Sequence, residues 1–192
     1  MTTTHSLISL IILILCCAIN AQKHDIITKS CIHASYPNIC LRTLSSYGGA
    51  ATTLTDLAQA SVKITLSQAR DTLNFLSNLK DKSNGREQGA LADCVDQMGD
   101  SVEELSKTLS ALHHLRRGDD FRWQMSNAET WVSAALTNEE TCVDGFKEID
   151  GKIRSDVRRR ITNVARVTSN ALYIINLLDD SRGKKLISVP KY

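Results

Sequence analysis

The segments ALADCVDQMGDSVEELSKTLSAL, residues 90–112, and MSNAETWVSAALTNEETCVDGF, residues 125–146, decide the fold of this chain. In both, apolar residues recur three and four positions apart, which is the spacing of a helix with one buried face. In the first segment these residues are Leu91, Cys94, Val95, Met98, Val102, Leu105, Leu109 and Leu112. In the second they are Met125, Ala128, Val132, Ala135, Cys142 and Phe146. The pattern predicts two amphipathic helices, each with one cysteine on its buried face.

A helix-breaking turn separates these two helices. Gly118 stands in the connection and is followed by Asp119 and Asp120, which suit the start of a helix. Residue 118 lies midway between Cys94 and Cys142, so a chain that folds back there brings both sulfur atoms to the same level. The sequence thus predicts an antiparallel helical hairpin closed by a disulfide, which requires the two Cα atoms to lie within about 7 Å.

Residues 1–21 have the character of a secretory signal peptide. The apolar run LISLIILILCCAI is followed by Asn20 and Ala21 and then by polar residues. This run is short for a membrane span of about 20 residues, and the small Ala21 suits cleavage directly after it. The residues before the run include no Lys or Arg, and an uncleaved anchor is the alternative.

Cleavage would remove Cys16 and Cys17 and leave four cysteines, Cys31, Cys40, Cys94 and Cys142. An even number of cysteines in an oxidising compartment favours two disulfides over metal or redox chemistry. Four cysteines allow three pairings. Sequential pairing is favoured, because one pair is close in sequence and the hairpin matches the other.

The mature chain divides into three parts. Residues 22–50 contain Tyr36-Pro37, and Pro is favoured at the first position of a helix, so we expect a short helix, a turn and a second short helix there. Residues 51–180 hold the central hairpin and two further long helices. Residues 181–192 lack helical periodicity and are rich in Lys and Arg, which predicts a mobile basic tail.

The two further helices flank the hairpin. One runs from Thr52 to about Leu79, and the other follows a break at Gly151. Their apolar positions are Leu54, Ala58, Val62, Ala69, Leu73 and Leu76, and Ile153, Val157, Ile161, Val164, Ala171, Ile175 and Leu178. Pro37 and Pro190 are the only prolines, and no alternating strand pattern occurs. The sequence predicts an all-α fold, an up-down-up-down four-helix bundle with an N-terminal short helical hairpin and two disulfides.

Composition and motifs argue against several functions. A net charge of +2 and an aromatic content of 5% do not indicate nucleic-acid binding. G-x-S-x-G, H-E-x-x-H and P-loop motifs are absent from the sequence, so hydrolase and nucleotide-binding functions have no local support, and we expect no cofactor and no metal. His113 and His114 are adjacent and point to different sides of a helix, which favours an exposed pair over a metal site. Trp123 and Trp131 are read as core residues or as anchors for a partner.

Two kinds of charge cluster remain. Glu103-Glu104 and Glu139-Glu140 lie between apolar positions and are interpreted as solvated helix faces. Basic residues gather at the start of the last helix: Lys152, Arg154, Arg158, Arg159 and Arg160. Local balance by Asp144, Glu148, Asp150 and Asp156 is the simplest interpretation, and contact with acidic groups of a partner is the alternative.

The chain resembles the plant invertase and pectin methylesterase inhibitor family across essentially all of the mature region. The motifs that carry this resemblance are Cys31-x8-Cys40 with Tyr36-Pro37 between, Ala90-Leu-Ala-Asp-Cys94, Trp131-Val-Ser-Ala-Ala-Leu-Thr137, Thr141-Cys-Val-Asp-Gly-Phe146 and Ser169-Asn-Ala-Leu172. Ala34 departs from the Thr often found there. The resemblance implies a four-helix bundle with sequential disulfides, no enzymatic activity, and secretion to the cell wall or apoplast.

The resemblance also implies a protein partner. Invertase inhibitors of the family carry Pro-Lys-Phe near the last helices, which is missing here, so the chain looks more like an inhibitor of pectin methylesterase that blocks the pectin-binding cleft non-covalently. Candidate contacts are the polar positions Asp96, Asp100, Thr137, Asn138 and Glu140. We expect a monomer or weak homodimer. Inhibition of cell-wall or vacuolar invertase and a secreted helical signalling ligand are the alternatives.

Overall fold

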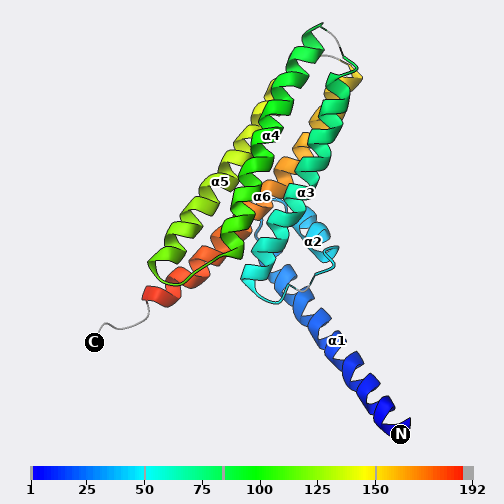
Figure 1. Ribbon diagram of the computed structural model, residues 1–192, viewed down its shortest axis with the longest axis vertical. Helices are drawn as coiled ribbons and strands as arrows, with labels where there is room; N and C mark the ends of the chain where they lie inside the picture. The colour runs from blue at the N-terminus through cyan, green and yellow to red at the C-terminus, as the bar shows by residue number, and fades with distance from the viewer. Residues whose placement is uncertain (1, 50, 84, 150, 188–192) are drawn as a thin grey trace.

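The computed structural model describes residues 2–49, 51–83, 85–149 and 151–187, and the regular structure within these ranges is all helical. The six helices are α1 (Thr2–Cys31), α2 (Pro37–Ser45), α3 (Leu54–Lys80), α4 (Gly85–His113), α5 (Asp119–Asp144) and α6 (Lys152–Ile187). In Figure 1, the four long helices α3 to α6 lie side by side, while α1 projects from one end of the molecule. The predicted all-α fold is confirmed.

The four long helices form a closed ring. Helix α3 packs against α4, α4 against α5, α5 against α6, and α6 back against α3. Successive helices run in opposite directions along the bundle axis (Figure 1). This arrangement confirms the predicted up-down-up-down bundle. As a consequence, the α4–α5 junction and the α3–α6 junction lie on opposite sides of the bundle.

The apolar faces predicted from the sequence form the core. On α4 the buried apolar residues are Leu91, Cys94, Met98, Leu105 and Leu112. On α5 they are Phe121, Met125, Ala128, Val132, Ala135 and Cys142. Burying a large apolar side chain contributes about 1.5–3 kcal/mol to the stability of the fold. The burial of these regularly spaced residues therefore holds the helices together in the ring. Helix α3 starts at a capping box, in which Thr53 and Asp56 each accept a hydrogen bond from the other's backbone N–H.

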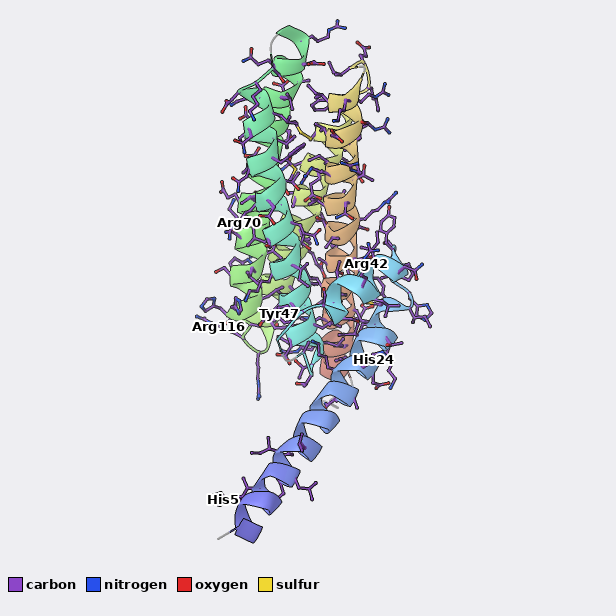
Figure 2. All side chains as sticks on the ribbon, turned by 90° about the vertical axis from the view of Figure 1, so that its right-hand side faces the viewer. His5, His24, Arg42, Tyr47, Arg70 and Arg116 are labelled. Atoms are coloured by element: carbon purple, nitrogen blue, oxygen red, sulfur yellow. A yellow bond between two sulfur atoms is a disulfide. The ribbon has the colours of Figure 1, made fainter. Side chains whose placement is uncertain are left out.

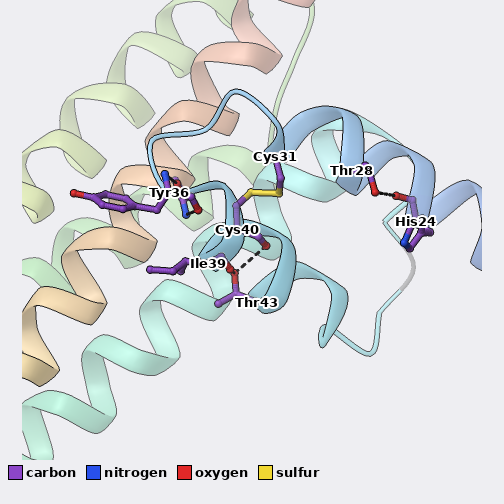
Figure 3. The surroundings of a disulfide bond; sticks show 8 residues. His24, Thr28, Cys31, Tyr36, Ile39, Cys40 and Thr43 are labelled. Atoms are coloured by element: carbon purple, nitrogen blue, oxygen red, sulfur yellow. Dashed lines mark hydrogen bonds between the residues drawn. A yellow bond between two sulfur atoms is a disulfide. The ribbon is translucent and has the colours of Figure 1, made fainter.

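The N-terminal hairpin consists of α1 and α2, joined by the disulfide between Cys31 and Cys40 with a Cα–Cα distance of 5.5 Å (Figure 3). Pro37 is the first residue of α2, as predicted. The Asn170 side chain on α6 accepts a hydrogen bond from the Tyr36 N–H at 2.9 Å and donates one to the Tyr36 carbonyl at 3.0 Å. These two bonds dock the hairpin on the bundle.

The first helix is longer than predicted. We expected a short helix within residues 22–50, but α1 begins at Thr2 and runs without a break to Cys31. The reason is that residues 1–31 contain neither Pro nor Gly to interrupt the helix. Across the part of the chain that the structure describes, no helix combines the length and apolar character needed to cross a membrane. Cleavage after Ala21 stays a prediction.

The predicted boundary of the basic tail at residues 181–192 is wrong, because α6 continues to Ile187. Its extension is anchored by Arg182, whose guanidinium donates to the Thr55 hydroxyl at 3.0 Å and lies 5.0 Å from the centre of the Phe121 ring. Because these contacts are made by a charged side chain, they stabilise the end of α6 without adding to the apolar periodicity from which the helix was predicted. Residues 188–192 lie outside the described residues.

Candidate functional site

The central hairpin of α4 and α5 is fixed at both ends. Near one end, the predicted disulfide joins Cys94 and Cys142, with a Cα–Cα distance of 4.6 Å. At the other end, Gly118 adopts a φ of 71°, a conformation that glycine tolerates without strain. The Gln124 side-chain amide then bonds to the backbone of the preceding turn twice, as donor and as acceptor, at 2.8 Å each. The two helices therefore present a rigid surface.

Glu139 lies inside the bundle at the level where three helices meet. Its side chain is fully buried on α5, and its Oε1 accepts hydrogen bonds from the Ser101 hydroxyl of α4 at 2.8 Å and the Thr168 hydroxyl of α6 at 2.9 Å. The interpretation of Glu139 as part of a solvated face is wrong. The sequence did contain a signal, since Glu139 lies at helical spacing from the buried Ala135 and Cys142.

Burial raises the pKa of Glu139 to about 7, because an apolar environment disfavours the charged carboxylate. The two hydroxyl hydrogen bonds oppose this rise, and the nearby Glu140 adds to it. The second carboxylate oxygen, Oε2, is buried without a hydrogen-bond partner among the described residues. The neutral acid therefore suits this position, and ionisation would place an incompletely compensated charge within the core.

The other acidic residues of these pairs follow the prediction more closely. Glu103 and Glu140 are exposed, as expected for solvated positions. Lys107 forms ion pairs with Glu103 at 2.8 Å and with Glu104 at 3.2 Å. The hydrogen bond from Lys107 and the positive charge of Lys107 lower the pKa of Glu103. Glu104 is only partly accessible, with a side-chain exposure of 21%.

The predicted contact residues lie on the outer surface of the hairpin but in more than one groove. Asp96 lines the groove between α4 and α5, and Glu140 lines the groove between α5 and α6. Asp100 and Thr137 are exposed, whereas Asn138 is half-buried. The structure therefore does not assemble these positions into a single pocket.

The α4–α5 groove is acidic. Asp93, Asp96 and Asp144 line it, and the disulfide forms part of its floor. Carboxylates on a rigid helical surface are suited to pair with basic groups of a partner protein. This acidic groove is the feature of the hairpin that sequence periodicity alone did not reveal, because periodicity identifies the buried face only.

The paired histidines and the two tryptophans lie outside the core. His113 and His114 are both exposed, as predicted. Trp123 is 69% exposed and Trp131 is half-buried, so neither is a core residue. Among the residues described, no cluster of three or more His, Cys, Asp or Glu side chains could hold a metal ion.

The basic residues at the start of α6 are partly balanced, as the simpler interpretation expected. Arg159 pairs with Asp156 at 3.0 Å. Arg160 instead lies over the ring of Phe75 on α3, with its guanidinium carbon 4.0 Å from the ring centre. Asp150, one of the predicted balancing residues, lies outside the described residues.

This fold and its surface define a class, a disulfide-stabilised four-helix bundle with a docked N-terminal hairpin. The family described as plant invertase/pectin methylesterase inhibitor matches residues 25–174, and the chain belongs to that family. The family is one of inhibitors, which confirms the prediction that the chain is not an enzyme.

Individual relatives agree with this assignment. Pectinesterase inhibitor 3 of Arabidopsis thaliana is 54% identical over 168 residues, which cover 83% of this chain and 82% of that protein. Pectinesterase inhibitor 9 of the same plant is 39% identical over 178 residues, covering 86% of each chain. The crystal structure of mutant form A of a pectin methylesterase inhibitor from Arabidopsis matches with a TM-score of 0.65 at 24% identity, over 77% of this chain and 93% of that chain. The last comparison confirms the fold.

Proposed function

We propose that this chain is a secreted, non-enzymatic inhibitor of pectin methylesterase. It forms a stoichiometric, non-covalent complex in which the exposed faces of α4 and α5 cover the pectin-binding cleft of the enzyme. The observation that carries the proposal is the 54% identity to a protein named pectinesterase inhibitor 3, over most of both chains. The lack of a Pro-Lys-Phe motif near the last helices agrees with this choice of target.

The rigidity of the hairpin supports binding. Association costs less free energy when the binding surface is already ordered, because fewer side-chain and backbone conformations are lost. The Cys94–Cys142 disulfide, the Gln124 turn and the buried Glu139 network all fix α4 relative to α5. An inhibitor with such a surface binds with little change of shape.

Within this surface, the exposed carboxylates of Asp96, Asp100 and Glu140 supply charge, and Thr137 and Asn138 supply polar groups for the contact. We expect them to meet basic and polar groups around the cleft. Asn138 is half-buried, so its contribution depends on a partner group that reaches between the helices.

The site of action follows from the N-terminal segment and the cysteines. Cleavage after Ala21 would release the protein to the cell wall, where both disulfides persist in an oxidising environment. The partner is a protein, and the active unit is a monomer or a weak homodimer that binds one enzyme molecule per chain.

An inhibition assay against two enzymes tests the proposal. The purified secreted chain is titrated into pectin methylesterase and, in parallel, into cell-wall and vacuolar invertases. We expect loss of pectin de-esterification with an endpoint at equimolar chain, and unchanged sucrose cleavage. The reverse result would assign the chain to invertase, and inhibition of neither enzyme would favour a signalling ligand.

A further inference from the structure

A second groove lies between α3 and α6, on the side of the bundle opposite the acidic α4–α5 groove. It is lined by Gln68 and Asp71 of α3 and by Arg159, Arg160, Asn163 and Arg166 of α6. Figure 2 views the molecule from the side on which α3 and α6 face the reader. Arg159, Arg160 and the α3 side of the groove therefore stay open when a partner covers α4 and α5, whereas Arg166 also lines the α5–α6 groove beside Glu140.

Positive charge predominates in this groove. Three arginines line it against the single lining carboxylate, Asp71. Arg159 pairs with Asp156 but keeps 74% of its side chain exposed. Arg160 lies over Phe75 and Arg166 lies 5.4 Å from the ring centre of Tyr36, so neither guanidinium is neutralised by these ring contacts. Stacking on rings leaves the edges of a guanidinium available for hydrogen bonds.

The groove also offers uncharged polar groups. The Asn163 amide donates to the Gln68 amide oxygen at 3.2 Å across the groove. A side-chain amide has both donor and acceptor capacity, so the pair can bond further to hydroxyl groups. Arg159 and Arg166 are seven residues apart on one helix, which separates their Cα atoms by about 10 Å along the helix axis. Cations spaced along a groove with amides between them suit an extended polymer that carries carboxylates and hydroxyls.

We infer that the α3–α6 groove binds de-esterified homogalacturonan, an acidic polysaccharide with a carboxylate and hydroxyl groups on each sugar. The arginines bind the carboxylates, and Gln68 and Asn163 bind the hydroxyls. The choice of this polymer rests on the proposed function, because removal of methyl esters by pectin methylesterase creates these carboxylates. The inhibitor would then hold the enzyme with one side and the reaction product with the other.

Calorimetric titration at low salt tests this inference. The full secreted chain is titrated with a de-esterified oligogalacturonide and with its fully methyl-esterified form. The groove variant Arg159→Gln/Arg160→Gln/Arg166→Gln is compared with Lys63→Gln/Arg70→Gln/Arg117→Gln, which removes the same charge from exposed positions outside the groove. Thermal unfolding of each variant checks that the fold is retained.

We expect the wild-type chain and the control variant to bind the de-esterified form alone. The groove variant should bind it about tenfold more weakly or worse, because charge-assisted hydrogen bonds are lost. Absence of binding by the wild type, equal binding of the esterified form, or equal weakening in both variants would overturn the inference. Inhibition of pectin methylesterase is measured with the same protein samples. If the wild-type chain does not inhibit the enzyme, the proposed function is rejected. If the wild-type chain inhibits fully but does not bind the oligogalacturonide, only this inference is rejected.

Discussion

The Ser101 hydroxyl on α4 donates a hydrogen bond to the Glu139 carboxylate on α5 at 2.8 Å, and both side chains are fully buried. Thr168 on α6 bonds to the same carboxylate oxygen. One acidic group thus links the three helices that include the proposed contact surface. Its protonation state is therefore coupled to the stability of the hairpin.

The stability of the fold should fall as pH rises through the range in which Glu139 ionises. The folded-state pKa of about 7 is above the ordinary value of 4.5, so between these values the folded chain holds a proton that the unfolded chain releases. The contribution of Glu139 to the free energy of unfolding is complete below pH 4.5 and is lost as pH rises through about 7. The full size of this contribution is about 3 kcal/mol.

Urea unfolding of the wild type and Glu139→Gln at several pH values checks this prediction. The Gln side-chain amide keeps an oxygen that accepts from Ser101 and cannot ionise. The stability of this variant should therefore not fall as pH rises. Glu148→Gln, at an exposed position, is the matched control and should behave like the wild type. Parallel pH profiles for the wild type and Glu139→Gln would contradict the assignment.

Removing the central disulfide should destabilise the protein. The bond between Cys94 and Cys142 closes a loop with a sequence separation of 48, for which the chain-entropy model gives about 4 kcal/mol. Cys94→Ala/Cys142→Ala should lower the unfolding free energy by about this amount, and Cys31→Ala/Cys40→Ala by about 3 kcal/mol. Denaturant titration measures both, and a wild type whose midpoint is unchanged after confirmed reduction would disprove this role.

Asn170→Ala should loosen the N-terminal hairpin from the bundle. The substitution removes both hydrogen bonds to the Tyr36 backbone and should cost about 1–3 kcal/mol. Hydrogen exchange should accelerate in α2 while α4 and α5 keep their protection. Asn78→Ala, at an exposed position of α3, is the control. Unchanged exchange in α2 of Asn170→Ala would mean that other contacts dock the hairpin.

Charge reversal at Asp100 should weaken inhibition of pectin methylesterase. An exposed carboxylate at an interface acts mainly on the association rate, so Asp100→Lys should slow association and reduce its dependence on salt. Asp71→Lys makes the same change on the opposite side of the bundle, in the α3–α6 groove, and should leave inhibition intact. Stopped-flow association kinetics distinguish the two, and equal effects would remove Asp100 from the interface.

The sequence was sufficient for the buried faces of the four long helices, because apolar spacing reports which face of a helix is buried, and it also predicted both disulfides. It did not predict the length of α1 or the end of α6. For Glu139 the spacing from Ala135 and Cys142 indicated the core face, but the hydroxyl partners on α4 and α6 that accommodate a buried acid there come from tertiary packing. The Tyr36–Asn170 contact joins residues far apart in the chain, and the last turns of α6 depend on Arg182 contacts with α3 and α5. These features depend on tertiary packing, which local periodicity does not encode.

Hydroxyl-radical footprinting of the chain, free and mixed with an equimolar amount of pectin methylesterase, tests the central claim most directly. We predict protection of the outward-facing side chains of α4 and α5 around Asp96, Asp100 and Glu140, with the α3–α6 groove around Arg159 still reactive. Protection centred on that groove, or no protection anywhere at inhibitory concentrations, would contradict the account.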